Sequence, residues 1–288
     1  MKLFRYSLQG QSHVGVLPAG QTSHFADLAS LVTDVPDDIT ALFDPALRAR
    51  VEQSLAKTPT AALQPLAGLP FEVPLAHPPK IVCMGLNYAD HAKEGGNARP
   101  EYPSFFMRAA TSMTPHNGPI VRPKVSESLD WEGELAVIIG QGGRNIPESQ
   151  ALQHVAGYSC YNDGSVREWQ FHAKQIAAGK NFESTGGFGP WMVTADEIDP
   201  QRKLKLEVRL NGEVVQSGDT GQMIFSVAKL IAYASTIFTL VPGDVIITGT
   251  PSGVGFSRKP PRFMKAGDVC EVEIEGVGVL RNPIVDQV

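Results

Sequence analysis

The chain has few cysteines, no long apolar run and no excess of basic residues, and each shortage excludes a class of protein. Cys83, Cys160 and Cys270 lie far apart within apolar runs and form no Cys-x-x-Cys pair, so we expect buried packing residues. No segment approaches the ~18 consecutive apolar residues of a membrane span, and no apolar leader follows Met1. We therefore expect a cytoplasmic protein without a membrane partner.

The charge balance excludes a polyanionic partner. With 25 basic and 30 acidic residues, the formal net charge is -5, which offers no electrostatic footprint for nucleic acid. The 288 residues are 42% hydrophobic and 19% charged. This composition is typical of a globular protein that buries a substantial core.

The first 75 residues differ in pattern from the rest. Prolines over residues 64–79 disfavour both helix interior and central strand, so this stretch is predicted to be an extended linker. We predict a small N-terminal α/β domain with its linker over residues 1–75 and a larger catalytic domain over 76–288. Within the smaller unit, the expected strands and helices lie at Leu3–Tyr6, Val14–Leu17, Phe25–Val32 and Ala41–Ala56.

Short β-rich runs separated by glycine and proline dominate from Lys80 onward. The predicted strands are Ile81–Met84, Leu135–Ile139, Val155–Tyr161, Leu204–Leu210, Val245–Thr248, Val269–Ile274 and Val277–Leu280. Two stretches predict helices, Ser165–Ala178 and Phe225–Phe238. Many short strands with few helices favour an α+β, β-rich fold with a closed or folded-over mixed sheet.

Two carboxylates stand at the mouth of a strand that we expect to be buried. Glu132 and Glu134 come just before the apolar run Leu135–Ile139, and alternate strand residues share a face. Burial side by side would raise the pKa of at least one carboxylate unless a cation neutralised the pair. With Asp163 as a third oxygen donor downstream, the pattern suggests a hard cation such as Mg²⁺.

Asp163 has two interpretations, because it can cap the helix predicted after it or bind a metal. If that helix starts at Asp163, then Arg167, Gln170 and Lys174 lie on the side of the acid. Arg167 and Gln170 suit a carboxylate and a carbonyl oxygen respectively. Lys180 opens a glycine-dense loop that matches no phosphate-binding pattern. It is either a solvated surface lysine or a residue that faces a substrate.

His91 and Glu94 lie one turn apart on a short predicted helix that Gly95 and Gly96 end. A carboxylate that accepts a hydrogen bond from one imidazole nitrogen fixes the tautomer and makes the other nitrogen a better base. An exposed ion pair is the alternative. The flanking glycines favour a lid that closes over the site.

Residues 271–275 provide an internal control for the Glu-x-Glu spacing. Glu271, Glu273 and Glu275 also alternate, but Val272 and Ile274 between them predict an amphipathic strand whose glutamates face water. The spacing is therefore weak by itself, and its surroundings decide its meaning.

Taken together, these motifs resemble those of the fumarylacetoacetate hydrolase family, in order over residues 80–285. The matching segments are Asn87-Tyr-Ala-Asp-His91, Asp130-Trp-Glu-Gly-Glu134-Leu-Ala, Asn162-Asp163, Arg167-x-x-Gln170, Gly179-Lys180 and Val241-Pro-Gly-Asp-Val-Ile-Ile-Thr-Gly-Thr250-Pro-Ser-Gly-Val-Gly255. The first 75 residues resemble the variable appendage of many bacterial members.

The resemblance implies a mixed β-sandwich roll, a homodimer and a bound divalent metal ion, Mg²⁺ or Mn²⁺, for which Ca²⁺ could substitute structurally. It implies that Glu132, Glu134 and Asp163 hold the metal and that His91 and Glu94 activate a water from a mobile lid. The residues that it places around a small oxo-acid substrate are Arg167, Gln170, Lys180 and Thr250.

The activity that we expect first is hydrolysis of a carbon-carbon bond in an acylpyruvate-like 1,3-diketone acid, as in the catabolism of aromatic compounds. Lys180 would stabilise the developing enolate. Alternatives on the same site are isomerisation of 2-hydroxymuconate or hydroxyheptadienedioate diacids, decarboxylation of oxaloacetate and hydrolysis of dehydrated sugar acids. A metal-stabilised binding protein is a further alternative, although it needs no His-Glu pair on a lid.

The sequence leaves the substrate tail open. Specificity is expected along the lid and in Tyr102–Arg108, whose aromatic residues can equally belong to the core. Arg108 could meet a distal carboxylate, but a structural ion pair is the favoured interpretation.

Overall fold

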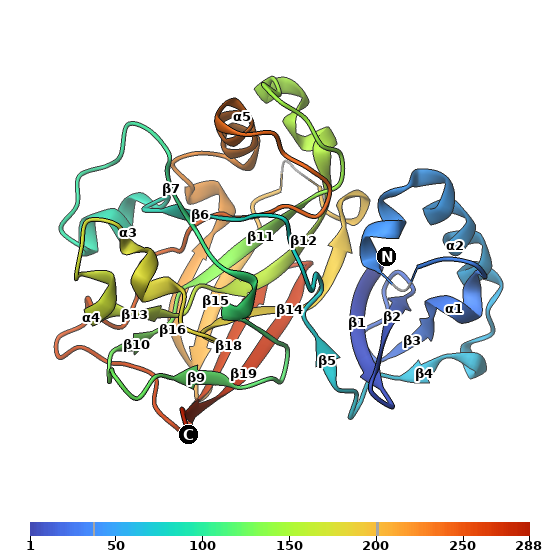
Figure 1. The fold of residues 1–288 in the computed structure, drawn as a ribbon, viewed down its shortest axis with the longest axis horizontal. Helices are drawn as coiled ribbons and strands as arrows, with labels where there is room; N and C mark the ends of the chain where they lie inside the picture. The colour runs from blue at the N-terminus through green and yellow to red at the C-terminus, as the bar shows by residue number, and fades with distance from the viewer. Residues whose placement is uncertain (37, 200–201) are drawn as a thin grey trace.

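A long mixed sheet runs from the N-terminal residues into the larger part of the chain (Figure 1). The computed structural model describes residues 1–36, 38–199 and 202–288. In spatial order, the strands of this sheet are β4 (Gln64–Pro65), β3 (His24–Asp27), β2 (Gln11–Leu17), β1 (Lys2–Leu8), β14 (Gly186–Thr194), β12 (Val155–Asn162), β11 (Gly133–Ile139), β17 (Val245–Ile247), β6 (Ile81–Gly85) and β7 (Ser104–Met107). Two further strands pair with β1 and β14 respectively, β5 (Phe71–Glu72) and β8 (Met113–Pro115).

A second sheet packs against the first. Its strands, in spatial order, are β16 (Glu213–Asp219), β15 (Lys205–Leu210), β18 (Val269–Ile274), β19 (Gly278–Asp286) and β9 (Ile120–Arg122). A separate short pair consists of β10 (Leu129–Asp130) and β13 (Ser165–Val166). This is the β-rich α+β architecture of the fumarylacetoacetate hydrolase type that the sequence predicted.

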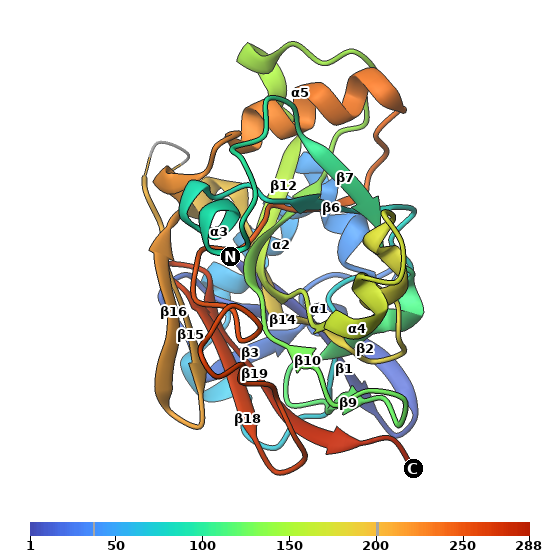
Figure 2. The same cartoon turned by 90° about the vertical axis from the view of Figure 1, so that its left-hand side faces the viewer.

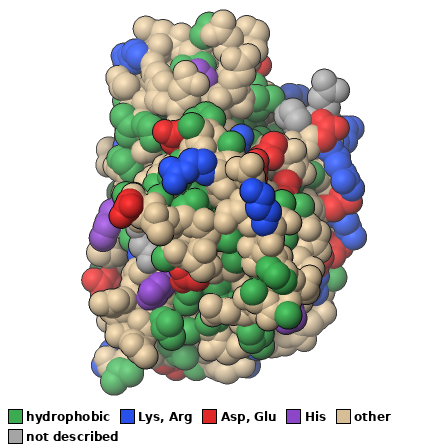
Figure 3. Space-filling view, turned by 90° about the vertical axis from the view of Figure 1, so that its right-hand side faces the viewer, with side chains coloured by type: hydrophobic (Ala, Val, Ile, Leu, Met, Phe, Trp, Pro, Cys, Tyr) green, Lys and Arg blue, Asp and Glu red, His purple; other side chains and the backbone are tan. Residues whose placement is uncertain are grey.

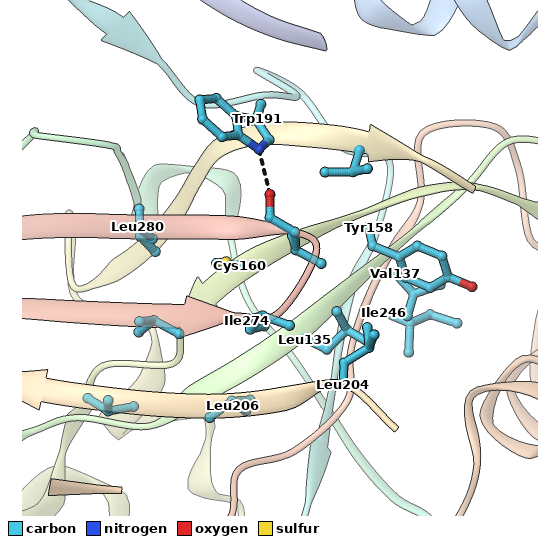
Figure 4. Packing of buried hydrophobic residues seen from close by; sticks show 14 of the residues in the cluster. Leu135, Val137, Tyr158, Cys160, Trp191, Leu204, Leu206, Ile246, Ile274 and Leu280 are labelled. Carbon is cyan, nitrogen blue, oxygen red and sulfur yellow. Dashed lines mark hydrogen bonds between the residues drawn. The ribbon is translucent and has the colours of Figure 1, made fainter. Parts of the chain in front are cut away.

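Strand β11 is apolar along its length because both of its faces are covered. Leu135 and Val137 pack in one hydrophobic cluster with Leu206 and Ile274 of the second sheet, as Figure 4 shows. Ala136 and Ile138 point the other way, into a second cluster that includes Leu3 and other residues of the N-terminal part. The start of β11 is therefore fixed from both sides, which holds the side chains at its mouth in place.

The helices are short and lie around the sheets. The α-helices are α1 (Leu28–Leu31), α2 (Pro45–Lys57), α3 (Ala89–Glu94), α4 (Arg167–Gln170) and α5 (Val227–Ile237). The 3₁₀ turns are η1 (Ile39–Phe43), η2 (Thr60–Ala62), η3 (Ala110–Ser112), η4 (Glu148–His154), η5 (Ile176–Lys180), η6 (Ala195–Glu197) and η7 (Thr220–Gln222). Helices α3 and α4 lie on the side away from the N-terminal strands (Figures 1 and 2). Among the described helices, none is long and apolar enough to cross a membrane.

The N-terminal residues are joined to the larger part by backbone pairing. Strand β1 pairs with β14, with Lys2 opposite Val193 and Leu3 opposite Met192. Figure 3 shows that acidic and basic side chains are interspersed over the face of the molecule on this side. The division into domains at residue 75 remains a prediction, since this pairing makes the sheet continuous.

Most predicted elements of the larger part are present, and their ends have moved by a few residues. All seven predicted strands have counterparts, and the second predicted helix is α5. In the N-terminal part, α2 begins at Pro45 rather than at Ala41, because Asp44 caps it by accepting from the N–H groups of Ala46 and Leu47. The stretch from Phe25 to Val32 is half strand, β3, and half helix, α1.

The predicted helix over Ser165–Ala178 is wrong. Ser165 and Val166 pair with β10, α4 covers Arg167–Gln170 alone, and the chain then folds back. A Cβ added at Gly179 would lie 2.5 Å from the backbone nitrogen of Gln170, whereas a continuous helix would separate these residues by about 13 Å along its axis. Lys174, which helical spacing placed beside the site, is exposed.

A hydrogen bond from Trp191 connects the two sheets. Its indole Nε1 donates to the carbonyl oxygen of Val277, and the two atoms are 2.6 Å apart (Figure 4). Replacing Trp191 by Phe leaves an aromatic ring but removes this buried donor, and we expect a loss of about 1–3 kcal/mol. Urea unfolding measures it. Tyr102→Phe, at an exposed position, is the control and should change stability by less than ~0.5 kcal/mol. Equal unfolding midpoints for the two variants would contradict this role.

Candidate metal centre and active site

Three buried carboxylates meet at the mouth of β11. One oxygen from each of Glu132, Glu134 and Asp163 lies within 4.8 Å of the others. Glu134 is the second residue of β11, while Asp163 follows β12 and its N–H donates to the carbonyl oxygen of Glu132. Asp163 does not cap the helix, since Val166 occupies the cap of α4. The sequence prediction that brought these three acids together is therefore matched by their geometry.

Lys180 lies inside this cluster and is not a surface lysine. Its ammonium nitrogen is 2.6 Å from Glu132 Oε2 and 2.6 Å from Asp163 Oδ2, and its side chain is only 2% exposed. The chain folds back through η5, and Gly179 packs so closely against Gln170 that no side chain would fit there. This close packing places Lys180, the next residue, inside the cluster.

Two arginines pair with the carboxylate oxygens of Glu132 and Asp163 that Lys180 does not contact. Arg108 Nη1 lies 2.5 Å from Asp163 Oδ1, so Arg108 forms a buried structural ion pair with one of the three clustered acids, as the favoured interpretation had it. Arg167 Nη2 lies 2.6 Å from Glu132 Oε1. Arg167 is anchored in turn by Asp130, whose Oδ2 accepts from Arg167 Nε at 2.8 Å.

Glu134 is the exception in this network. Among the ion pairs of the described residues none includes Glu134, whose Oε2 accepts from the N–H of Gly249 at 2.5 Å. Burial, together with the charges of Asp163 and Glu132, raises the pKa of Glu134 well above its usual range. Burial acts in the same direction on Glu132, but Lys180 and Arg167 outweigh it and lower the pKa of that carboxyl.

The cluster fits a divalent cation. Four buried carboxylates, Asp130 included, face three buried cations, so one negative charge is left without a partner. An all-oxygen donor set is the one that hard divalent cations prefer. Glu132, Glu134 and Asp163 would hold such an ion, and its charge would offset the carboxylate that the protein leaves uncompensated.

The His91–Glu94 pair faces the same space from α3. His91 Nδ1 lies 2.8 Å from Glu94 Oε1. Burial acts to raise the pKa of Glu94, but hydrogen bonds from His91 and from the Gly253 N–H outweigh it, so the pKa is lowered and the side chain is a carboxylate at neutral pH. A charged Glu94 is the form that orients an imidazole.

A cavity of about 320 Å³ joins these groups. His91, Glu132, Glu134 and Lys180 line it, as do the three predicted substrate residues, Arg167, Gln170 and Thr250. Gln170 accepts from Arg167 Nη1 through its Oε1 at 2.8 Å, so it orients the arginine. The Thr250 hydroxyl donates to the carbonyl oxygen of Gly133 and accepts from Gln216.

Sequence reasoning missed two supports of the site. Asp130 was noted within a motif and given no role, although its position two residues before Glu132 was a usable signal of a shared face. The second support consists of backbone N–H groups from residues 249–256, which no side-chain pattern reveals.

Comparison with known proteins agrees with this geometry. Residues 80–285 match the model of the fumarylacetoacetate hydrolase C-terminal domain. The chain belongs to the fumarylacetoacetate hydrolase family. It is 42% identical to human mitochondrial oxaloacetate tautomerase FAHD2A over 257 residues, which is 84% of this chain and 82% of the relative.

Two solved structures of the family cover the full chain and are themselves covered in full. The fumarylacetoacetate hydrolase of Exiguobacterium antarcticum superposes with a TM-score of 0.85 at 36% identity. Maleylpyruvate hydrolase from Sphingobium sp. SYK-6, solved in complex with manganese(II) and pyruvate, superposes with a TM-score of 0.79 at 29% identity. The family contains both hydrolases and enzymes with other activities on oxo acids.

The substitution Glu134→Gln tests whether Glu134 is a ligand of a metal ion. Gln keeps the shape and cannot ionise, so folding of the metal-free protein no longer includes the cost of protonating or desolvating this acid, and the protein should gain about 1–2 kcal/mol. The rise in melting temperature that Mn²⁺ gives the wild type should disappear. Thermal unfolding with EDTA and with Mn²⁺ measures both effects.

The control is Glu271→Gln on the outer face of β18, where Glu271 pairs with Arg209 at the surface. It should leave both melting temperatures unchanged. A Glu134→Gln variant that still responds to Mn²⁺ like the wild type would remove Glu134 from the metal site.

Proposed function

We propose that this protein is a divalent-metal-dependent enzyme that moves a proton at the carbon beside the carbonyl of a 2-oxo acid, with keto-enol tautomerisation of oxaloacetate as its reaction. The observation that carries the proposal is the cavity that His91, held by Glu94, lines together with Glu132 and Glu134 of the carboxylate cluster. The name of the human relative supports oxaloacetate as the substrate.

The residues of this chain take separate roles in the proposed reaction. A divalent cation supplies Lewis-acid polarisation of the oxo-acid oxygens when it is bound. His91, held by Glu94, removes the proton from C3 of the keto form. Lys180 places positive charge beside the oxygen that becomes negative. That oxygen takes a proton from water and His91 returns its proton to water, which gives the enol.

Mg²⁺ and Mn²⁺ are the proposed cations. Three carboxylates and no sulfur or imidazole among the proposed ligands suit both ions. The Sphingobium relative, solved in complex with manganese(II), supports Mn²⁺. The homodimer implied by the resemblance also remains a prediction.

Hydrolysis of an acylpyruvate, the activity expected first from the sequence, is the second candidate. Its support is the apolar lining that the cavity has in addition to its polar groups, with Phe106, Phe171 and Phe256 among it. A four-carbon diacid makes little use of three aromatic rings, whereas an apolar acyl group would bury surface against them. In this reaction His91 would take a proton from water, and the products would be pyruvate and a carboxylic acid.

A substrate assay separates the two functions. With Mn²⁺ or Mg²⁺, we expect the enzyme to accelerate the loss of enol absorbance from oxaloacetate without releasing pyruvate. Release of pyruvate and an acid from an acylpyruvate would instead support hydrolysis. EDTA should abolish either activity, and Mn²⁺ should restore it. A 2-hydroxymuconate assayed in parallel tests the isomerase alternative.

The substitution His91→Ala tests whether His91 is the base that removes the proton from C3. Because the reaction has no other imidazole among the described cavity residues, we expect turnover to fall by at least ~100-fold. The Mn²⁺-induced rise in melting temperature should persist, since His91 is not a proposed ligand. Asp90→Asn, the exposed neighbour on α3, is the matched control and should keep its activity. Wild-type turnover in His91→Ala would refute the mechanism.

A further inference from the structure

The acid of the His91–Glu94 pair is also held from outside its own helix. The backbone N–H of Gly253 lies 2.9 Å from Glu94 Oε2 and 3.1 Å from Oε1. The Ser257 hydroxyl lies 3.1 Å from Glu94 Oε2. Glu94 therefore connects α3 to the loop of residues 249–257, which follows β17.

This loop, residues 249–257, serves three acids of the site. Its backbone N–H groups donate to Glu134 from Gly249, to Glu94 from Gly253, and to Asp130 from Gly255 and Phe256. Gly253 has a φ of +108°, and a Cβ there would lie 2.4 Å from the carbonyl oxygen of Val215. The loop is thus packed in one conformation, which makes it a fixed surface for Glu94 to bind.

The two ends of α3 are held differently. Before the helix, Asn87 is fully buried and donates through Nδ2 to the carbonyl oxygens of Phe225 and Thr248. After the helix, residues 96–99 are exposed. Within the described residues, Glu94 is the member of segment 90–103 that hydrogen-bonds to a distant element. The position of His91 over the cavity therefore depends on the contacts of Glu94.

The Ser257 hydroxyl has two acceptors for its single proton. It lies 3.1 Å from Glu94 Oε2 and 3.0 Å from the carbonyl oxygen of Val254. If α3 moves away, the hydroxyl still has Val254 as an acceptor, so release of Glu94 leaves no unsatisfied group on the serine. Breaking the contact therefore costs Glu94 one hydrogen bond but leaves the hydroxyl with an acceptor.

We propose that Ser257 is a positioning residue that holds Glu94, and through it His91, over the metal centre. The inference rests on the proposed function for its catalytic consequence, and the structural part stands without it. Hydrogen bonds to a carboxylate are stronger than those between neutral groups. Loss of the hydroxyl should therefore loosen the C-terminal end of α3 while leaving the three carboxylates of the metal site untouched.

The first experiment needs no substrate. Hydrogen exchange of the full-length protein should show backbone amides of residues 89–96 exchanging about three- to tenfold faster in Ser257→Ala than in the wild type. Ser257→Thr, which keeps the hydroxyl, should restore the slow exchange. Ser252→Ala, on the same loop and without a hydrogen bond to Glu94, should leave exchange unchanged. Equal exchange in Ser257→Ala and the wild type would overturn the proposal.

The second experiment uses turnover of whichever oxo acid the enzyme accepts. Ser257→Ala should lower kcat about three- to tenfold with KM and the Mn²⁺-induced melting shift unchanged. In a Glu94→Gln background the same substitution should have little further effect, because the two residues act as one unit. A full additional loss in that background would show that Ser257 acts elsewhere. If the wild-type protein turned over none of the oxo acids, the proposed function would be contradicted. The hydrogen-exchange result would still decide the role of Ser257.

Discussion

The site depends on the compensation of charges that have been removed from water. Asp130, Glu132 and Asp163 each lie against an arginine or lysine, and Lys180 serves two of them at once. Removing one member would leave its partner as an unpaired buried charge, which is far more costly than losing a surface ion pair. The segments that carry these residues are β10, the residue before β11, the residue after β12, α4 and η5, and they are consequently tied to one another. Among the described acids of this cluster, Glu134 is the one without a cationic partner.

The scaffold supplies the rigidity that such a cluster requires. Residues of β11 alternate between two hydrophobic clusters, so neither face of the strand can move toward solvent. The carboxylates stand where this fully buried strand begins, and Trp191 joins the two sheets beyond it. The loop of residues 249–257 then adds backbone donors, which have no side-chain freedom to lose. Packed strands fix the positions of the acids, and backbone amides fix their orientations.

Local sequence patterns predicted the parts of the site that depend on local geometry. The three-residue spacing of His91 and Glu94 follows from the helix period. The two-residue spacing of Glu132 and Glu134 also predicted that they meet, although Glu132 lies just before β11, which begins at Gly133. The predicted helix after Asp163 failed because its first residues pair with Leu129 and Asp130, far away in the chain, and periodicity within a window cannot register such a partner. Position in the sequence left Lys180 open between the surface and the substrate, the resemblance placed it beside the substrate, and it lines the cavity. The backbone donors of the loop were invisible, since every residue has an N–H group.

The two candidate reactions differ less in the metal centre than in what lies above it. Both would begin with a 2-oxo acid bound at the cation that the same carboxylates would hold, beside Lys180, so these groups do not select between them. Proton transfer at C3 requires His91 close to the substrate itself, whereas hydrolysis requires room for a water between them. The distance between His91 and the substrate depends first on how firmly α3 is held, which Glu94 and Ser257 control. It depends also on how far an apolar tail of the substrate extends along Phe106, Phe171 and Phe256. On the proposed function, reaction specificity therefore resides in the lid and in the aromatic lining, and the buried ionic cluster is the part that different activities of the family can share.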